Sequence, residues 1–69
     1  MADTGLQNRL REHRARLALT QAELAERVGV SRKTINTVEN GVFTPSATLA
    51  LKLARALGVS VEKIFSLAD

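Results

Sequence analysis

A glycine separates two short amphipathic segments in the first half of the sequence, and this arrangement restricts the fold more than any other feature. From Thr20 to Val28 the apolar residues recur at helical spacing. Thr20 and Glu23 have the spacing of a capping box, in which two side chains reciprocally satisfy open backbone N–H groups. Gly29 follows where helices commonly end in a left-handed residue. The sequence therefore predicts a helix to about Val28 and a sharp turn after it.

The residues after this turn predict a second helix with a polar outer face. Ser31 is a residue type preferred at the helix N-cap, and steps of about 100° place Ile35 and Val38 on the inner side. The opposite face then collects five polar residues: Arg32, Lys33, Asn36, Thr37 and Asn40. Two short helices joined in this way predict a helix-turn-helix over about residues 20–40.

A further helix is expected before this motif. Thr4 and Gln7 have the spacing of another capping box, and the helix that they open is predicted to run to about Ala18. Its apolar stripe consists of Leu6, Leu10 and Leu17.

Two more helices are expected after the motif. Gly41 suits the position after a helix end, and residues 42–45 form a loop. Ser46 caps a fourth helix that Gly58 ends, and Ser60 caps a short last one. Their inward residues are predicted to be Ala50, Leu53, Ala54, Leu57, Val61, Ile64 and Phe65, with Leu49 and Leu51 beyond the stripe of the fourth helix. Because no alternation typical of strands is visible, the predicted fold is all-α.

The sequence resembles the Cro/C1 repressor family, also called the XRE-like family. The resemblance rests on Gln21, Leu24, Ala25, Val28, Gly29, Val30, Ser31, Ile35, Glu39, Asn40, Gly41, Pro45 and the Ala-Leu-Gly-Val-Ser run at 56–60. It extends from about Leu10 to Phe65. It implies a compact five-helix, lambda-repressor-like DNA-binding domain.

Length and composition narrow the class of protein. The 69 residues are expected to form one domain over 1–69, without a separate sensor and therefore without a small-molecule ligand. So short a chain has modest stability unless it associates, which favours a homodimer. The sequence has no cysteine, no long apolar run and no visible signal peptide, so we expect a cytoplasmic, nucleoid-associated prokaryotic protein, with no membrane partner and no metal or other cofactor.

The distribution of charge points to an anionic partner. The net charge is +3, and residues 1–33 carry all of this excess, with seven Lys or Arg against four Asp or Glu. Phe43 and Phe65 are the only aromatic residues, so the stacking surfaces that bind single strands are missing. Double-stranded DNA is the expected partner.

Four residues of the second motif helix are the candidates for reading bases. Arg32 and Lys33 can donate to guanine, Asn36 has the amide suited to adenine, and Thr37 has a methyl group suited to thymine. The resemblance places base reading at Arg32, Lys33 and Thr37, with Asn36 at their edge. The alternative for each residue is a phosphate contact or simple solvation. Many relatives carry glutamine at the first two positions, so the operator sequence is not predictable.

Other residues are expected to contact the DNA backbone. The resemblance implies that Gln21 contacts phosphate and supports the recognition helix, and that Asn40 also contacts phosphate; the alternative for Asn40 is a helix-end cap. The loop from Phe43 to Ser46 is expected to approach phosphates through its backbone. Such contacts position a protein without specifying a sequence.

A salt bridge between Arg14 and Glu39 is the expected structural ion pair. Glu39 falls toward the inner edge of its helix, where a carboxylate requires a partner. The resemblance implies that Arg14 is this partner. Each of the other arginines of this helix is expected either to lie on a solvated face or to have another role; these are Arg9, Arg11 and Arg16.

An apolar patch near the C-terminus is the candidate dimer surface. Ile64, Phe65 and Leu67 could form it, although the first two are equally consistent with core positions.

We expect a sequence-specific transcriptional regulator, in particular a repressor, that places helix 31–40 in the major groove. The alternative is an antitoxin-like or controller protein that acts mainly through a protein partner. An enzyme is not expected, because the single histidine, His13, has no cysteine or spaced carboxylate cluster beside it.

Overall fold

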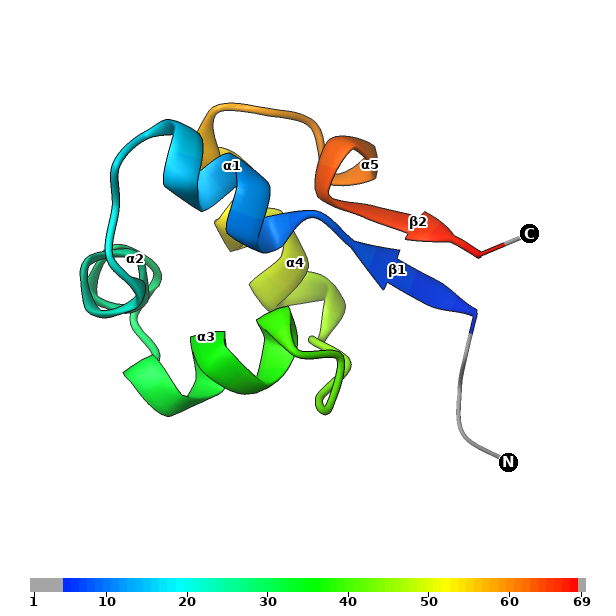
Figure 1. Ribbon diagram of the computed structural model, residues 1–69, viewed down its shortest axis with the longest axis horizontal. Helices are drawn as coiled ribbons and strands as arrows, with labels where there is room; N and C mark the ends of the chain where they lie inside the picture. The colour runs from blue at the N-terminus through cyan, green and yellow to red at the C-terminus, as the bar shows by residue number, and fades with distance from the viewer. Residues whose placement is uncertain (1–4, 69) are drawn as a thin grey trace.

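The helix-turn-helix lies within a bundle of five helices, and a small antiparallel sheet closes one end of it (Figure 1). The computed structural model describes residues 5–68. Its elements are β1 (Leu6–Asn8), α1 (Leu10–Arg16), α2 (Gln21–Val28), α3 (Arg32–Glu39), α4 (Ala47–Leu57), α5 (Val61–Ile64) and β2 (Phe65–Leu67). The five helices expected from the sequence are present, and the all-α fold class is confirmed, with the sheet a minor addition.

Every helix contributes to one core. The largest fully buried side chains are Leu10 from α1, Leu24 from α2, Ile35 and Val38 from α3, Leu53 from α4 and Ile64 from α5. Burial of such aliphatic side chains stabilises a domain by about 1.5–3 kcal/mol each. The core therefore connects α3 to the rest of the bundle through its inner face and leaves its outer face to solvent.

The local signals around the turn form as predicted. Thr20 and Glu23 make both bonds of the capping box, with Glu23 N donating to Thr20 Oγ1 at 3.0 Å and Thr20 N donating to Glu23 Oε1 at 2.8 Å. Gly29 ends α2 at a φ of +80°. Ser31 caps α3 by accepting a hydrogen bond of 3.1 Å from Thr34 N. The turn is thus fixed on both sides by hydrogen bonds.

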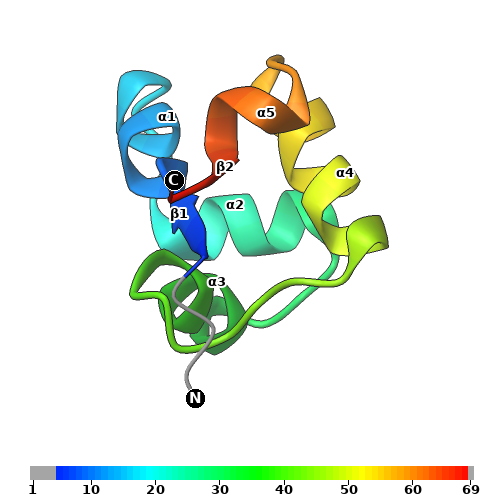
Figure 2. The same ribbon diagram turned by 90° about the vertical axis from the view of Figure 1, so that its right-hand side faces the viewer.

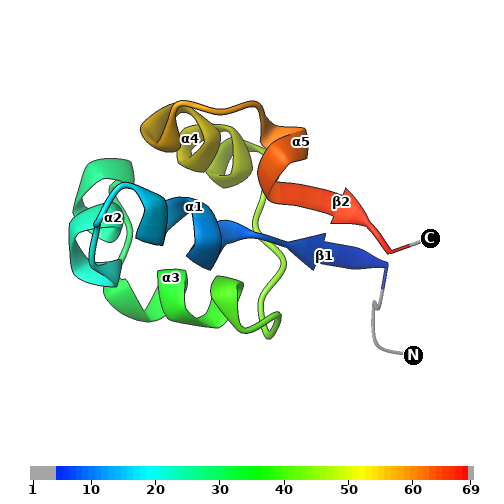
Figure 3. The ribbon, with the colours of Figure 1, turned by 45° about the horizontal axis from the view of Figure 1, so that its top comes forward.

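The N-terminal segment differs from the expectation. Residues 6–8 form a strand instead of the first turns of a helix, and they pair with β2 in the register Leu6↔Leu67, Gln7↔Ser66 and Asn8↔Phe65. The predicted cap residue Thr4 lies outside the described residues. Figures 1 and 3 show the two strands side by side, although they come from opposite ends of the chain. The distant strand provides the backbone partners that a helix would have provided locally.

The first helix also ends earlier than expected. It stops at Arg16, and Ala18 adopts a left-handed conformation with a φ of +57°. This change of direction turns Leu17 outward to 45% exposure and brings Leu19 into the core at 8%. The predicted inward position of Leu17 is therefore wrong, and Leu19 takes its place.

A smaller difference concerns α4. Leu49 is buried, whereas the sequence placed it beyond the apolar stripe, and the expected core residue Ala50 is only half-buried. Leu53, Ala54 and Leu57 are buried as predicted.

The arrangement leaves α3 at the molecular surface. In Figure 2 it lies at the lower edge with α5 at the top, and Figure 3 shows α4 and α5 on the side of α1 that faces away from α3.

Candidate nucleic-acid interface

Two unpaired cations occupy the N-terminal end of α3. Arg32 and Lys33 are both exposed and follow directly on the cap residue Ser31. Within residues 5–68 neither side chain makes a hydrogen bond or an ion pair. Their donors are therefore free for guanine acceptors or for phosphate oxygens.

Thr37 lies one turn further along the same helix. Its hydroxyl donates to the carbonyl oxygen of Thr34 at 3.0 Å, and the residue is half-buried. The hydroxyl proton is thus used inside the helix, and the methyl group and the hydroxyl oxygen are what remain for a base. Beside Thr37 is a shallow hollow of about 330 Å³ lined by Ser31, Lys33, Thr34, Thr37, Val42 and Phe43.

Glu39, at the other end of α3, is the most enclosed charged group of this surface. Its side chain is 0% exposed, and its Oε2 lies 2.6 Å from Arg14 Nε, so the expected ion pair between α1 and α3 is present. A second bond of 3.2 Å joins Arg14 Nη2 to Glu39 Oε1, and Arg14 Nη1 donates to the Leu19 carbonyl oxygen at 2.7 Å. The arginine thereby ties α3, α1 and the following turn together.

The ion pair shifts the pKa of both partners. Burial raises the pKa of the Glu39 carboxyl, but the hydrogen bonds from Arg14 and Gln21 and the charge of Arg14 outweigh it, so the pKa lies below its ordinary value. The hydrogen bond with Glu39 raises the pKa of Arg14, against the opposing effect of burial. Glu39 is thus held as a carboxylate.

Glu39 and four polar side chains around it form a closed ring of hydrogen bonds, which we call the polar ring. Its members are Arg11, Gln21, Asn36, Glu39 and Asn40. Gln21 Nε2 donates to Glu39 Oε1 at 3.1 Å and to Asn36 Oδ1 at 3.2 Å. Asn40 Nδ2 also donates to Asn36 Oδ1 at 3.2 Å. Arg11 closes the ring by donating to Asn40 Oδ1 at 3.1 Å and to Glu39 Oε1 at 3.4 Å.

The polar ring restricts how the predicted phosphate-contacting residues can act. Both amide hydrogens of Gln21 are used inside the protein, so its free donor is the backbone N–H in the first turn of α2. Asn40 keeps one amide hydrogen without a partner among the described residues. The backbone N–H of Phe43 donates to the Thr37 carbonyl oxygen at 3.2 Å. Ser46 caps α4 through its hydroxyl oxygen and retains its hydroxyl proton as a donor.

Sequence reasoning missed two residues that support this surface. Arg11 joins the polar ring, and its position three residues before Arg14 on one helix face was a usable signal. Asn8 donates to the Val38 carbonyl oxygen at 3.1 Å and accepts from Leu10 N at 3.2 Å, so it connects β1 and the start of α1 to α3. No local pattern marks Asn8, because Val38 is 30 residues away.

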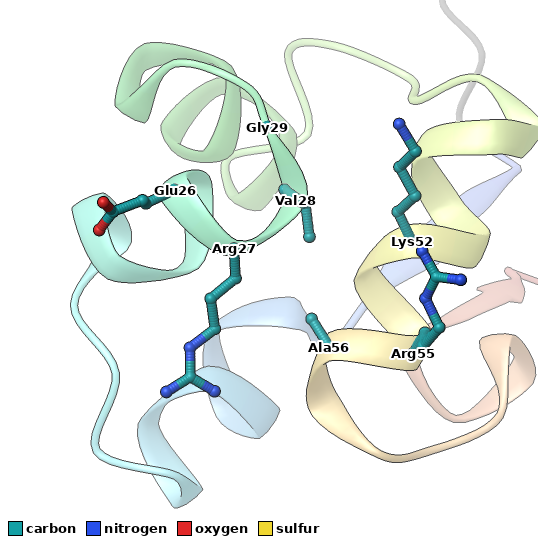
Figure 4. Close-up of a pocket in the computed structure, with 7 residues that line it drawn as sticks. All are labelled: Glu26, Arg27, Val28, Gly29, Lys52, Arg55 and Ala56. Carbon is teal, nitrogen blue, oxygen red and sulfur yellow. The ribbon is translucent and has the colours of Figure 1, made fainter.

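A second hollow, of about 390 Å³, lies between the end of α2 and α4 (Figure 4). Arg27 extends from α2 and Lys52 and Arg55 from α4, while Glu26 points away from the two cations of α4. None of the residues predicted to contact DNA lines this hollow. Its cations therefore provide a comparison for those of α3.

The structure separates the three residues of the suggested C-terminal patch. Ile64 is 1% exposed and belongs to the core, and Phe65 packs against the core as a partly buried residue. Leu67 is 72% exposed on β2. The apolar surface available to a partner at this end is therefore centred on Leu67.

Residues 5–68 lack two other kinds of site. No group of three or more metal-binding side chains occurs there. In the same range no helix has the length and apolar character needed to cross a membrane. His13 instead bonds the Lys63 carbonyl oxygen through Nε2 at 3.2 Å and Arg16 through Nδ1 at 3.1 Å.

The sequence of this chain is similar to those of known helix-turn-helix proteins. The sequence model of the helix-turn-helix family matches residues 10–64. An HTH-type transcriptional regulator of Methanothermobacter thermautotrophicus is 58% identical over 59 residues, which cover 84% of this chain and 86% of the relative.

Two solved structures are similar to this chain in both fold and sequence. The restriction-modification controller protein C.AhdI from Aeromonas hydrophila is 38% identical, with a TM-score of 0.77 over 80% of this chain and 83% of that one. The P22 c2 repressor in complex with a synthetic operator is 35% identical, with a TM-score of 0.76 over 78% of this chain and 82% of that one.

Proposed function

The chain belongs to the Cro/C1-type helix-turn-helix family of DNA-binding transcriptional regulators, and on this basis we propose that it recognises a specific duplex sequence with α3 and represses transcription there. The observation that carries the proposal is the contrast within α3 itself. Its N-terminal end has two cations that are unpaired within residues 5–68, whereas its C-terminal half is anchored by the buried carboxylate of Glu39. A helix held in this way can enter the major groove with its free end toward the bases.

The base-reading residues in this proposal are Arg32, Lys33 and Thr37, with Asn36 beside them. The two cations donate to guanine acceptors, and the methyl group of Thr37 contacts a thymine methyl group. The exposed side chains of Val42 and Phe43 border the same hollow as Thr37, and they extend the apolar surface near that base.

Phosphate contacts hold the helix in the groove. We assign them to the backbone N–H of Gln21 at the start of α2, to the free amide hydrogen of Asn40, and to the loop that ends at Ser46. Backbone donors at a helix N-terminus favour an anion because the open N–H groups and the helix dipole both point toward it. These contacts set position without reading sequence.

A homodimer would present two copies of α3 to one face of DNA. We place its contact at Leu67, because this large apolar side chain is exposed on β2. Recognition helices of such dimers enter successive major grooves about 34 Å apart. Sedimentation velocity of the wild type and of Leu67→Asp tests this contact. A dimer in the first and a monomer in the second is expected, and dimers in both would exclude it.

Selection from random duplex DNA at near-physiological salt tests the function. The expected result is an enriched sequence with two inverted half-sites about one helical turn apart. Recovery of no preferred sequence would contradict the proposal. It would favour a controller that acts mainly through a protein partner.

A further inference from the structure

The polar ring contains two charged side chains, Glu39 and Arg11, and their chemistry fixes the direction of every hydrogen bond in the ring. The carboxylate of Glu39 can only accept, and the guanidinium of Arg11 can only donate. Gln21 must therefore turn its Nε2 toward Glu39, because its carbonyl oxygen would repel the carboxylate. With that orientation fixed, the second hydrogen of Nε2 points toward Asn36, whose Oδ1 lies 3.2 Å from Nε2.

The same reasoning fixes the amide of Asn36. Its Oδ1 accepts from Gln21 Nε2 and from Asn40 Nδ2, and a carbonyl oxygen has two lone pairs. If this amide were turned over, Nδ2 would face two other donors. Asn40 cannot turn over either, since its own oxygen accepts from Arg11. Asn36 is exposed, and its Nδ2 has no partner within residues 5–68, so two hydrogens are its only groups free for a ligand.

An asparagine normally reads adenine with both ends of its amide, because adenine offers the N7 acceptor next to the N6 amino donor. Asn36 has only donors to offer, and they would meet the N6 amino group unfavourably. Guanine offers two acceptors, O6 and N7, at the same edge. We propose that Asn36, held by Gln21 and Asn40, selects guanine over adenine, the reverse of what its residue type indicates. This inference rests on the proposed entry of α3 into the major groove.

Binding titrations on the selected operator and its single-base variants test the inference. At one position the wild type is expected to bind guanine over adenine by about fivefold or more. Asn36→Ala should abolish that preference and leave unchanged the preferences at positions read by Arg32 and Lys33. Lys33→Ala is the matched control. It should abolish the preference at the position that Lys33 reads and leave the guanine preference at the Asn36 position unchanged. An adenine preference that disappears in Asn36→Ala would overturn the inference, and so would unchanged base preferences in that variant.

Gln21→Ala tests whether the polar ring is the cause. It frees one lone pair of Asn36 and removes one of the two donors that oppose a turn of the amide. The discrimination between guanine and adenine should therefore shrink at the Asn36 position alone. Equal discrimination in this variant and the wild type would show that the ring does not set it. Melting curves by circular dichroism must show that the variants are folded.

Failure of the inference can be told from failure of the proposed function. A wild type that enriches no sequence overturns the proposed function, and the inference with it. A wild type that enriches a clear operator with adenine at the Asn36 position overturns the inference alone.

Discussion

The two ends of α3 differ in how firmly the protein holds them. At the N-terminal end Arg32 and Lys33 are exposed and unpaired within residues 5–68. At the C-terminal end the side chain of Glu39 is 0% exposed and Asn36 accepts two hydrogen bonds. A buried carboxylate must be paired to remain in the fold, whereas an exposed cation costs little without a partner. One helix therefore combines an anchored half with a half that is free to bind.

This difference has a practical consequence for mutagenesis. Substitutions in the anchored half should act mainly on stability, and substitutions in the free half mainly on DNA binding. The polar ring belongs to the anchored half but also holds Asn36, which is proposed to read a base, so substitutions in the ring should affect both properties.

Glu39→Gln should have the largest effect. It leaves Arg14 with a buried charge and no opposite partner, so the free energy of unfolding should fall by about 3 kcal/mol or more. In a domain of this size that corresponds to a decrease in melting temperature of about 12 °C or more. Thermal unfolding followed by circular dichroism measures it.

Glu26→Gln is the matched control for this experiment, because Glu26 is exposed and has no hydrogen bond or ion pair within residues 5–68. Its melting temperature should stay close to that of the wild type. If Glu39→Gln melted within a degree or two of this control, the anchor at the C-terminal end would not exist.

Arg32→Ala and Lys33→Ala should have the next largest effect, and on a different property. Each should weaken operator binding by about 1–3 kcal/mol and relax the preference at particular base pairs. Stability should change by no more than about 0.5 kcal/mol, as for other surface substitutions. Binding titrations and urea unfolding on the same variants separate the two effects.

Lys52→Ala removes a cation of equal charge from the hollow between α2 and α4, and it should leave base preference unchanged. A loss of base preference in this variant equal to that in Lys33→Ala would mean that charge, and not position on α3, determines recognition.

Ser31→Ala tests the hydrogen bond that fixes the free end of α3. Loss of the cap to Thr34 N should lower the free energy of unfolding by about 1 kcal/mol. Ser60→Ala is the control, because Ser60 occupies the same position before α5 without a side-chain cap bond. Equal urea midpoints for the two variants would show that the cap contributes nothing.

The pH dependence of stability should also distinguish the C-terminal end of α3 from its N-terminal end. The pKa of Glu39 is lower in the folded chain than its ordinary value of 4.5, so its contribution is present above that value and is lost as the pH falls through the folded pKa. The difference in unfolding free energy between the wild type and Glu39→Gln should therefore narrow between about pH 6 and about pH 3. A constant difference over this range would exclude a pH-dependent contribution from Glu39.

The sequence by itself determined the parts of the protein that depend on neighbouring residues. The capping box of Thr20, the left-handed Gly29 and the cap of Ser31 are interactions within a few residues, and each formed as predicted. The 3.6-residue period likewise placed Ile35 and Val38 in the core. The helix-turn-helix and its exposed polar face were therefore predictable.

Only the tertiary structure decided what distant segments do to one another. Three residues are too few to show a strand period, so β1 exists because the C-terminal strand supplies its partners. The turn at Ala18 exchanged Leu17 for Leu19 in the core for a similar reason, since the path of the chain depends on what α1 packs against.

The polar ring shows the same limit at the site. A side chain's residue type gives its donors and acceptors, but only the folded arrangement shows which of them are already used. The amide of Asn36 has the donor and the acceptor that adenine recognition requires. Its contacts with Gln21 and Asn40 use the acceptor, so only donors remain for a ligand. Hydrogen bonding between helices is therefore the physical reason why sequence alone could locate the recognition surface without giving its specificity.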